Sequence, residues 1–352
     1  MIRRVLVASA VLLACVAATS HASSTTISPC RQVSQPIWSP DGQQIAYYGT
    51  RWPPPTGHHR NPNDILQALC TANADGTNAQ PLRHTVCSEN CPDPPDLVAW
   101  VKSGILYLRD GVVYRIVPGS KPQKVARTNS VAIVTNPTGT RIAGQLYYDG
   151  CLTCAGPLTI VNAQSGAVVG KVGGNKLDNV DPSLSPDGTT VAFDRYASNE
   201  SGKVFGIWTA RTNGSHLRQL VKVGQHPLWS PTGGRIAYTS GTSSVVLRLI
   251  SAGGGKSRVL VRRNVQNVFG WSPDGRYIAF ESGTGSTGRL AVVNVATGRV
   301  RSFAPLKFAP SAAWAPDSSE LVANSVSKTR CWSTWRVPVN GSKPTLISSC
   351  TS

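Results

Sequence analysis

The sequence predicts an all-β protein, a β-propeller of four-stranded antiparallel blades, with seven blades favoured and six as the alternative. A short motif, usually led by tryptophan, recurs along the chain, and its last four copies are spaced by 45, 42 and 43 residues. A period of about 40 to 45 residues is typical of propeller blades. Asn-Gly and Thr-Gly pairs separate alternating apolar runs, which is a strong hairpin signal. No long apolar helix pattern follows residue 25.

Each copy of the motif combines a large apolar residue, a Ser-Pro-Asp-Gly turn or a variant of it, and an Ile-Ala-Tyr-like strand. The copies begin at Trp38, Trp100, Thr135, Leu184, Trp229, Trp271 and Trp314, and those at Trp100 and Thr135 are degenerate. We expect the indole ring to lie between neighbouring blades. In the turn, proline presets φ, aspartate accepts bonds from backbone amides and glycine supplies a positive φ. The residues predicted to be structural are Trp38, Asp41, Gly42, Trp100, Asp187, Gly188, Trp229, Trp271, Asp274, Gly275, Trp314 and Asp317.

A second hairpin completes each predicted blade. Residues 204–210 and 217–221 flank Asn213-Gly214, and residues 290–294 and 300–303 flank the turn at Gly298. One such unit cannot bury both of its faces alone, whereas a closed ring of units can.

The repeat resembles the TolB-like, PD-type (WD-like) β-propeller family on the strength of copies such as Trp271-Ser272-Pro273-Asp274-Gly275. That family includes TolB of the Tol-Pal envelope system and the propellers of tricorn protease and the prolyl oligopeptidase group. The resemblance covers nearly all of residues 33–350 and implies a platform for binding partners, without naming one. TolB has six blades behind an N-terminal α/β domain, which we do not expect here because the repeats begin soon after the N-terminus.

The N-terminus predicts export. Residues 1–22 read as a signal peptide with a basic start, an apolar run over 5–18 and small residues before a cleavage site at Ala22. A lipoprotein signal is the alternative, in which Cys15 is lipidated. A short segment, 23–32, would then lead into a propeller over 33–352. We therefore expect a periplasmic, secreted or cell-surface protein, either free or anchored through Cys15, with no transmembrane span.

The chain is strongly basic, with a formal net charge of +18. Its basic residues are spread out and not interleaved with aromatic ones, so we do not expect nucleic acid as a partner. For an exported protein, an anionic glycan or an envelope protein is the expected partner.

The nine cysteines favour structural disulfides in an oxidising compartment. A turn centred between Asn340 and Gly341 would pair residues whose numbers sum to 681, as Cys331 and Cys350 do. The hairpin therefore predicts a Cys331–Cys350 bridge. A Cys30–Cys350 bridge across the ring's seam is the rival, and the absence of both is the third alternative.

Motifs for catalysis are missing from the sequence. It has no G-x-S-x-G nucleophile elbow and no HExxH, and the G-x-G-x-x-G at 283–288 would join two strands of one blade. We therefore predict a non-enzymatic binding or scaffolding protein with no catalytic residue, cofactor or metal. The pair His58-His59 is a minor metal alternative, in a stretch that reads as an exposed loop.

Polar residues precede several predicted inner strands, at the positions that should rim the central channel. These candidate binding residues are Asp96, Asp178, Asp181, Gln225, His226 and Asn267. The alternative function is a hydrolase or lyase acting on an anionic polysaccharide. Only His226, paired with Asp178 or Asp181, offers a candidate general base for it. A surface lipoprotein in envelope assembly is a third, weaker hypothesis.

Overall fold

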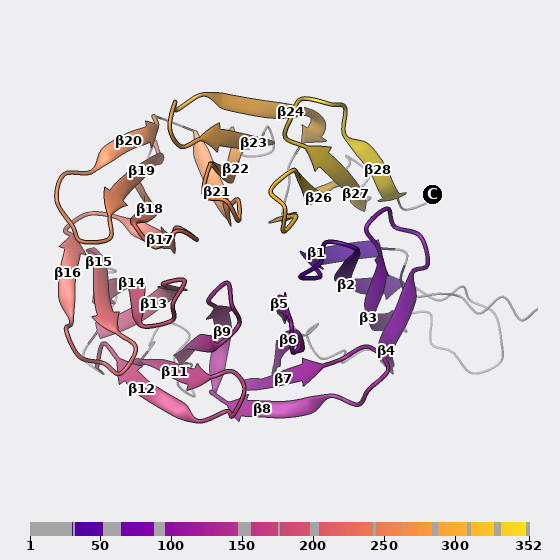
Figure 1. Ribbon diagram of the computed structural model, residues 1–352, viewed down its shortest axis with the longest axis horizontal. Helices are drawn as coiled ribbons and strands as arrows, with labels where there is room; N and C mark the ends of the chain where they lie inside the picture. The colour runs from indigo at the N-terminus through magenta and orange to yellow at the C-terminus, as the bar shows by residue number, and fades with distance from the viewer. Residues whose placement is uncertain are drawn as a thin grey trace, which may run out of the picture.

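The fold is seen in a computed structural model of the chain. The structure describes residues 30, 32–51, 65–87, 96–146, 156–174, 177–197, 204–241, 244–262, 264–283, 288–307, 311–326 and 332–349. Within them, seven separate four-stranded antiparallel sheets follow one another along the chain. Figure 1 shows the sheets as the blades of a ring, with the first strand of each blade nearest the centre. The predictions of an all-β fold and of seven blades are confirmed.

Every blade takes its strands in chain order from the centre of the ring outward. The inner strands are β1 (Gln32–Trp38), β5 (Asp96–Val101), β9 (Ser130–Thr135), β13 (Leu177–Leu184), β17 (Gln225–Trp229), β21 (Val265–Trp271) and β25 (Ala312–Trp314). The second strands are β2 (Gln44–Arg51), β6 (Gly104–Arg109), β10 (Arg141–Leu146), β14 (Thr190–Ala197), β18 (Arg235–Ser240), β22 (Tyr277–Ser282) and β26 (Glu320–Val326). The third strands are β3 (Ile65–Asn73), β7 (Val112–Ile116), β11 (Leu158–Asn162), β15 (Val204–Arg211), β19 (Val246–Ser251), β23 (Arg289–Asn294) and β27 (Trp332–Pro338). The outer strands are β4 (Gln80–Cys87), β8 (Gln123–Arg127), β12 (Val168–Val172), β16 (Arg218–Val221), β20 (Arg258–Val261), β24 (Val300–Lys307) and β28 (Thr345–Ser349).

The hydrophobic core lies between blades. Its buried side chains form seven clusters, and each cluster joins two neighbouring blades. The second strands explain this division, because successive side chains of a strand point to opposite faces. In β2, Ile45 and Tyr47 pack toward the last blade, whereas Ala46 packs toward the second blade. The Ile-Ala-Tyr unit is therefore buried on both faces.

The turn between the first two strands is held by short polar contacts. The Ser39 hydroxyl donates to Asp41 at 2.6 Å, and Asp41 also accepts the amide of Gln43 at 3.0 Å. Gly42 follows with a φ of 70°, in the left-handed region that glycine enters most readily. In the last blade Ser318 takes that conformation at a φ of 65°.

Tryptophan side chains bond neighbouring blades together. The Trp271 Nε1–H donates to the carbonyl of Leu228 in the preceding blade at 3.0 Å, and Trp314 donates to Gly270 at 3.1 Å. Trp38 makes the same bond to Ala313 at 3.1 Å, which joins the first blade to the last. Trp229 differs, because its Nε1–H donates to Gly233 in its own turn at 2.9 Å.

A disulfide joins Cys30 to Cys70, with 5.8 Å between their Cα atoms. The residue before β1 is thereby tied to β3 of the same blade. The rival Cys30–Cys350 bridge is therefore wrong, because Cys30 is bonded to Cys70. Cys331 and Cys350 lie outside the described residues, so their bridge stays a prediction.

The register of the last hairpin departs from the simple rule behind that prediction. Trp335 pairs with Leu346, as a sum of 681 requires, but a bulge makes Ser333 pair with Ser349 instead of Ser348. A β-bulge adds one residue to one strand and so shifts the numbering of every later pair.

Several other predictions concern residues beyond the described ranges. The signal peptide of residues 1–22, Cys15 and the pair His58-His59 are among them. Among the residues that are described, no helix has the length and hydropathy to cross a bilayer.

Candidate functional site

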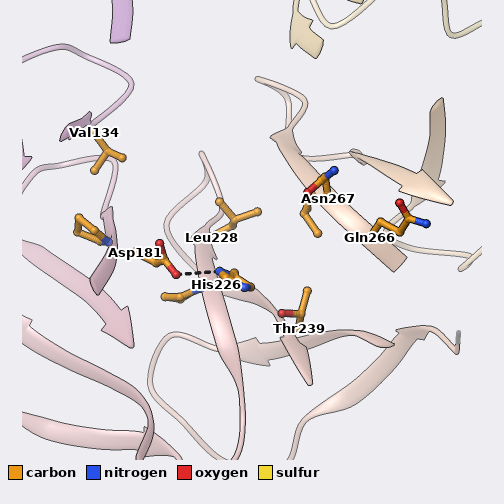
Figure 2. A pocket seen from close by; sticks show the side chains of 10 residues that line it. Val134, Asp181, His226, Leu228, Thr239, Gln266 and Asn267 are labelled. Carbon is orange, nitrogen blue, oxygen red and sulfur yellow. Dashed lines mark hydrogen bonds and ion pairs between the residues drawn. The ribbon is translucent and has the colours of Figure 1, made fainter. Parts of the chain in front are cut away.

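A cavity of about 310 Å³ opens among the inner strands of four consecutive blades, and we call it the axial pocket. Figure 2 shows side chains of separate blades around it, with Asp181 and His226 in contact. Its lining residues are Val134, Asp181, Pro182, His226, Pro227, Leu228, Thr239, Gln266, Asn267 and Val268. Polar groups on an apolar lining are the usual composition of a ligand site.

The pair His226 and Asp181 forms the polar centre of the axial pocket. The Nδ1 atom of His226 lies 2.8 Å from Oδ2 of Asp181, and both side chains are partly open to solvent. The hydrogen bond that His226 donates to Asp181 raises the pKa of His226 above its usual value, because the carboxylate stabilises the imidazolium. The two residues come from inner strands of neighbouring blades, β17 and β13.

Each of these two side chains lies at a backbone bulge, which directs it into the axial pocket. The ladder between β17 and β18 shifts register between Gln225 and Leu228, and the ladder between β13 and β14 does so between Val180 and Ser183. Within the bulges, His226 has a φ of 53° and Asp181 a φ of 50°, and each precedes a proline. Bulges redirect side chains in this way next to functional sites.

A third residue, Asp194, contacts the backbone of this pair. It lies in β14 and its side chain is completely buried. Its Oδ2 accepts the backbone amide of His226 at 2.8 Å, while its Oδ1 has no hydrogen-bond partner. Burial raises the pKa of this carboxyl group to about 8, because a charge is poorly solvated there. One donor atom each from Asp181, Asp194 and His226 lies within 4.8 Å of the other two.

Asp194 is not among the site residues predicted from the sequence, although its position in the repeat could have indicated it. The residue directly follows the Val191-Ala192-Phe193 unit of its blade. Strand alternation places it on the same face as Ala192, which packs toward the next blade, where His226 lies. The same position is polar in four other blades, where it holds Gln145, Thr239, Glu281 and Asn324. A polar residue there enters a buried interface and needs a partner.

One of these equivalents lines the axial pocket, and another bonds a residue that lines it. Thr239 lines it and donates to the carbonyl of Gln225 at 3.1 Å. Glu281 is fully buried, and its Oε2 accepts the side-chain amide of Asn267 at 2.7 Å. Burial raises the pKa of Glu281 above its usual value. Asn267 is thus held in place by a buried carboxyl group.

The structure brings together only part of the predicted rim. Asp181, His226 and Asn267 line the axial pocket. Gln225 does not line it and instead donates to the hydroxyl of Tyr196 at 2.6 Å.

The other two predicted rim residues lie apart from the axial pocket. Asp178 is buried in β13, and its Oδ1 has no partner. Asp96 is exposed at the start of β5 and lies 3.4 Å from the side-chain amide of Gln35. Of the two carboxylates considered as partners of His226, Asp181 is the one in contact.

Comparison with known proteins finds likeness in structure and none in sequence. No family model matches the chain, and no curated protein matches it. An oligogalacturonate lyase in complex with manganese aligns with a TM-score of 0.59 and 16% identity, over 90% of this chain and 88% of that one. Puromycin hydrolase aligns with a TM-score of 0.63 and 14% identity, over 92% of this chain and 55% of that one.

A putative TolB from Agrobacterium tumefaciens aligns with a TM-score of 0.50 and 16% identity, over 68% of this chain and 91% of that one. At such identities a likeness establishes the fold and leaves function open. The repeat motif, the seven sequential blades and these alignments together make this chain a seven-bladed β-propeller of the TolB-like fold.

Proposed function

We propose that this protein is an exported, non-enzymatic β-propeller that binds a polar ligand in the axial pocket. The observation that carries the proposal is the convergence of Asp181, His226 and Asn267 from three blades on one cavity. Ordinary loop variation does not require polar side chains from separate blades to share one cavity, whereas a binding site does.

The chemistry of the lining favours a ligand rich in hydroxyl groups. Asp181 accepts hydrogen bonds, Asn267 can both donate and accept, and Thr239 adds a hydroxyl, while Val134 and Leu228 offer apolar surface. The net charge of +18 adds a long-range attraction for anionic polymers. We therefore propose an envelope glycan as the ligand, with an envelope protein as the competing partner.

Affinity capture tests this proposal. The full mature chain is immobilised and exposed to envelope extract, and retained glycans and proteins are identified by mass spectrometry. We expect retention of glycans by the parent protein and a loss of about tenfold or more for Asn267→Ala, if that amide contributes a typical charge-assisted bond. Asp96→Asn is the matched control, because Asp96 is a predicted rim residue outside the axial pocket. If Asn267→Ala retains as much glycan as the parent, the proposal is contradicted.

A second candidate function is the cleavage of an anionic polysaccharide. The 2.8 Å contact between His226 and Asp181 favours it, because a carboxylate that orients an imidazole is a common general-base arrangement. Incubation with acidic polysaccharides, followed by chromatography of the products, distinguishes the two functions. Shorter products that disappear with His226→Gln would establish cleavage, and intact polymer that stays bound would leave the protein a binding module.

A further inference from the structure

We infer that Asp181, Asp194 and His226 form a binding site for a divalent transition-metal cation at the interface of the fourth and fifth blades. From the sequence, no metal is expected. The inference concerns the same pocket as the proposed function but does not depend on it, because a cation can bind whether or not a glycan does.

The spacing of the donor atoms suits a cation. Each of the three residues offers one donor atom within 4.8 Å of the other two. The imidazole Nδ1 of His226 and Oδ2 of Asp181 lie 2.8 Å apart. Neighbouring ligands of an ion with bonds of about 2.1 Å are roughly 3 Å apart. The pair therefore needs only a small adjustment to become two adjacent ligands of one ion.

A second observation, the environment of the Asp194 carboxyl group, also points to a ligand at this cluster. Its side chain is completely buried, and its Oδ1 has no hydrogen-bond partner. An ionised carboxylate left in that state is costly, so buried carboxylates are normally paired or bound to a metal. A divalent ion would supply a partner for that oxygen.

The backbone holds two of the three ligands rigidly. Asp181 and His226 both adopt a positive φ before a proline, which is a costly conformation that surrounding structure must impose. The amide of His226 also bonds Oδ2 of Asp194 and so fixes one ligand relative to another. Gln35 occupies the same kind of bulge in the first blade but carries no titratable group.

The donor set defines the class of cation. Two carboxylates with one imidazole suit Zn²⁺ or Mn²⁺, whereas Ca²⁺ and Mg²⁺ prefer oxygen ligands alone. Asp181 and His226 both line the axial pocket, so the remaining coordination positions would face that cavity. Water or an exchangeable ligand could occupy them, as in metal sites with three protein ligands.

Calorimetric titration of the full mature chain with Zn²⁺ and with Mn²⁺, after treatment with a chelator, tests the inference. We expect the parent to bind one ion at the site of Asp181, Asp194 and His226. Asp194→Asn and His226→Gln should each weaken the affinity for that ion by at least about tenfold. Asp96→Asn and His216→Gln are the matched controls, since both residues are exposed and outside the cluster. Binding with the same affinity in Asp194→Asn as in the parent, or no binding by the parent, overturns the inference.

X-ray absorption of the zinc-loaded parent protein keeps the test decisive if a variant fails to fold. We expect a first shell of oxygen and nitrogen with one imidazole. A shell containing sulfur, or two imidazoles, would place the ion elsewhere, for example at His58-His59, and would contradict the inference. If Asp194→Asn loses metal binding but captures as much glycan as the parent, the metal site is supported and glycan binding does not depend on it.

Discussion

At the scale of single residues, the repeat depends on aspartates that accept hydrogen bonds inside the turn. Asp187 accepts the hydroxyl of Ser185 and the amide of Thr189. These two hydrogen bonds lower the pKa of Asp187 below its usual value, and the bond from Ser185 contributes most. The pKa of Asp41 is lowered in the same way, first by Ser39. Each turn therefore favours the ionised carboxylate.

This preference predicts an acid sensitivity of the fold. A carboxyl group whose pKa is lower in the folded state stabilises the protein above the unfolded pKa, and that stability is lost as pH falls through the folded value. We expect the free energy of unfolding to fall below about pH 4. In Asp187→Asn, part of this dependence should be absent. Denaturant unfolding at a series of pH values measures it, and identical slopes for parent and variant would contradict the assignment.

Glu281 should act in the opposite direction. Burial raises its pKa, so its contribution to stability is present below the unfolded pKa and is lost as pH rises through the folded value. Glu281→Gln keeps an acceptor for Asn267 but cannot ionise, so the variant should lose less stability than the parent as pH rises above the usual pKa of a glutamate. Chemical denaturation at a series of rising pH values tests this, with Asp96→Asn as an exposed control. A steeper loss in Glu281→Gln would refute the prediction.

At the scale of elements, each blade is a sequential four-stranded sheet, and its inner strand carries the variable positions. The bulges in β1, β13 and β17 occur just before a proline, which cannot donate to the ladder. In β13 and β17 the bulge frees one backbone amide, which donates to a side chain of the preceding blade. His226 donates to Asp194, and Asp181 donates to Gln145 at 3.4 Å. The same element thus joins blades and presents side chains to the axial pocket.

The first blade has a further constraint, the Cys30–Cys70 disulfide. Its two cysteines are separated by 40 residues, so the bridge restricts a long loop of the unfolded chain. We expect the double variant Cys30→Ser, Cys70→Ser to lose about 2–4 kcal/mol of stability. Denaturant unfolding without reductant measures the loss while the other cysteines keep their state. A change of less than about 0.5 kcal/mol would show that the bridge does not constrain unfolding.

At the scale of the whole molecule, the ring closes without a strand shared between its first and last blades, as far as the described residues show. The first blade takes all four strands from the start of the chain, and the last blade takes all four from its end. Figure 1 shows these two blades side by side. The seam is closed by an apolar cluster that contains Trp38, Ile45 and Val322, and by the bond from Trp38 to Ala313. The seam is therefore held by the same kinds of contact as the other pairs of neighbouring blades.

Trp38 should consequently matter to the closure of the ring. Its side chain is 7% exposed, and its indole both packs in the seam cluster and bonds across it. Trp38→Ala should destabilise the protein by about 3–5 kcal/mol, and Trp38→Phe should cost less because the ring volume is mostly kept. Thermal unfolding of both variants tests this. Unchanged unfolding of Trp38→Ala would show that the seam is held by other contacts.

The sequence by itself determined the repeat and the order of the strands, because these depend on turn chemistry and alternation within about 45 residues of chain. It favoured seven blades over six, and the structure decided for seven. The sequence also pointed to His226 and Asp181, although it left Asp178 as an equal alternative. Only the tertiary structure decided which polar groups meet, since Asp181 and His226 are 45 residues apart and join through the packing of two blades. The partner of Cys30 and the burial of Asp194 were decided in the same way. Contacts between blades depend on bulges and ring geometry, which local patterns in a sequence do not encode.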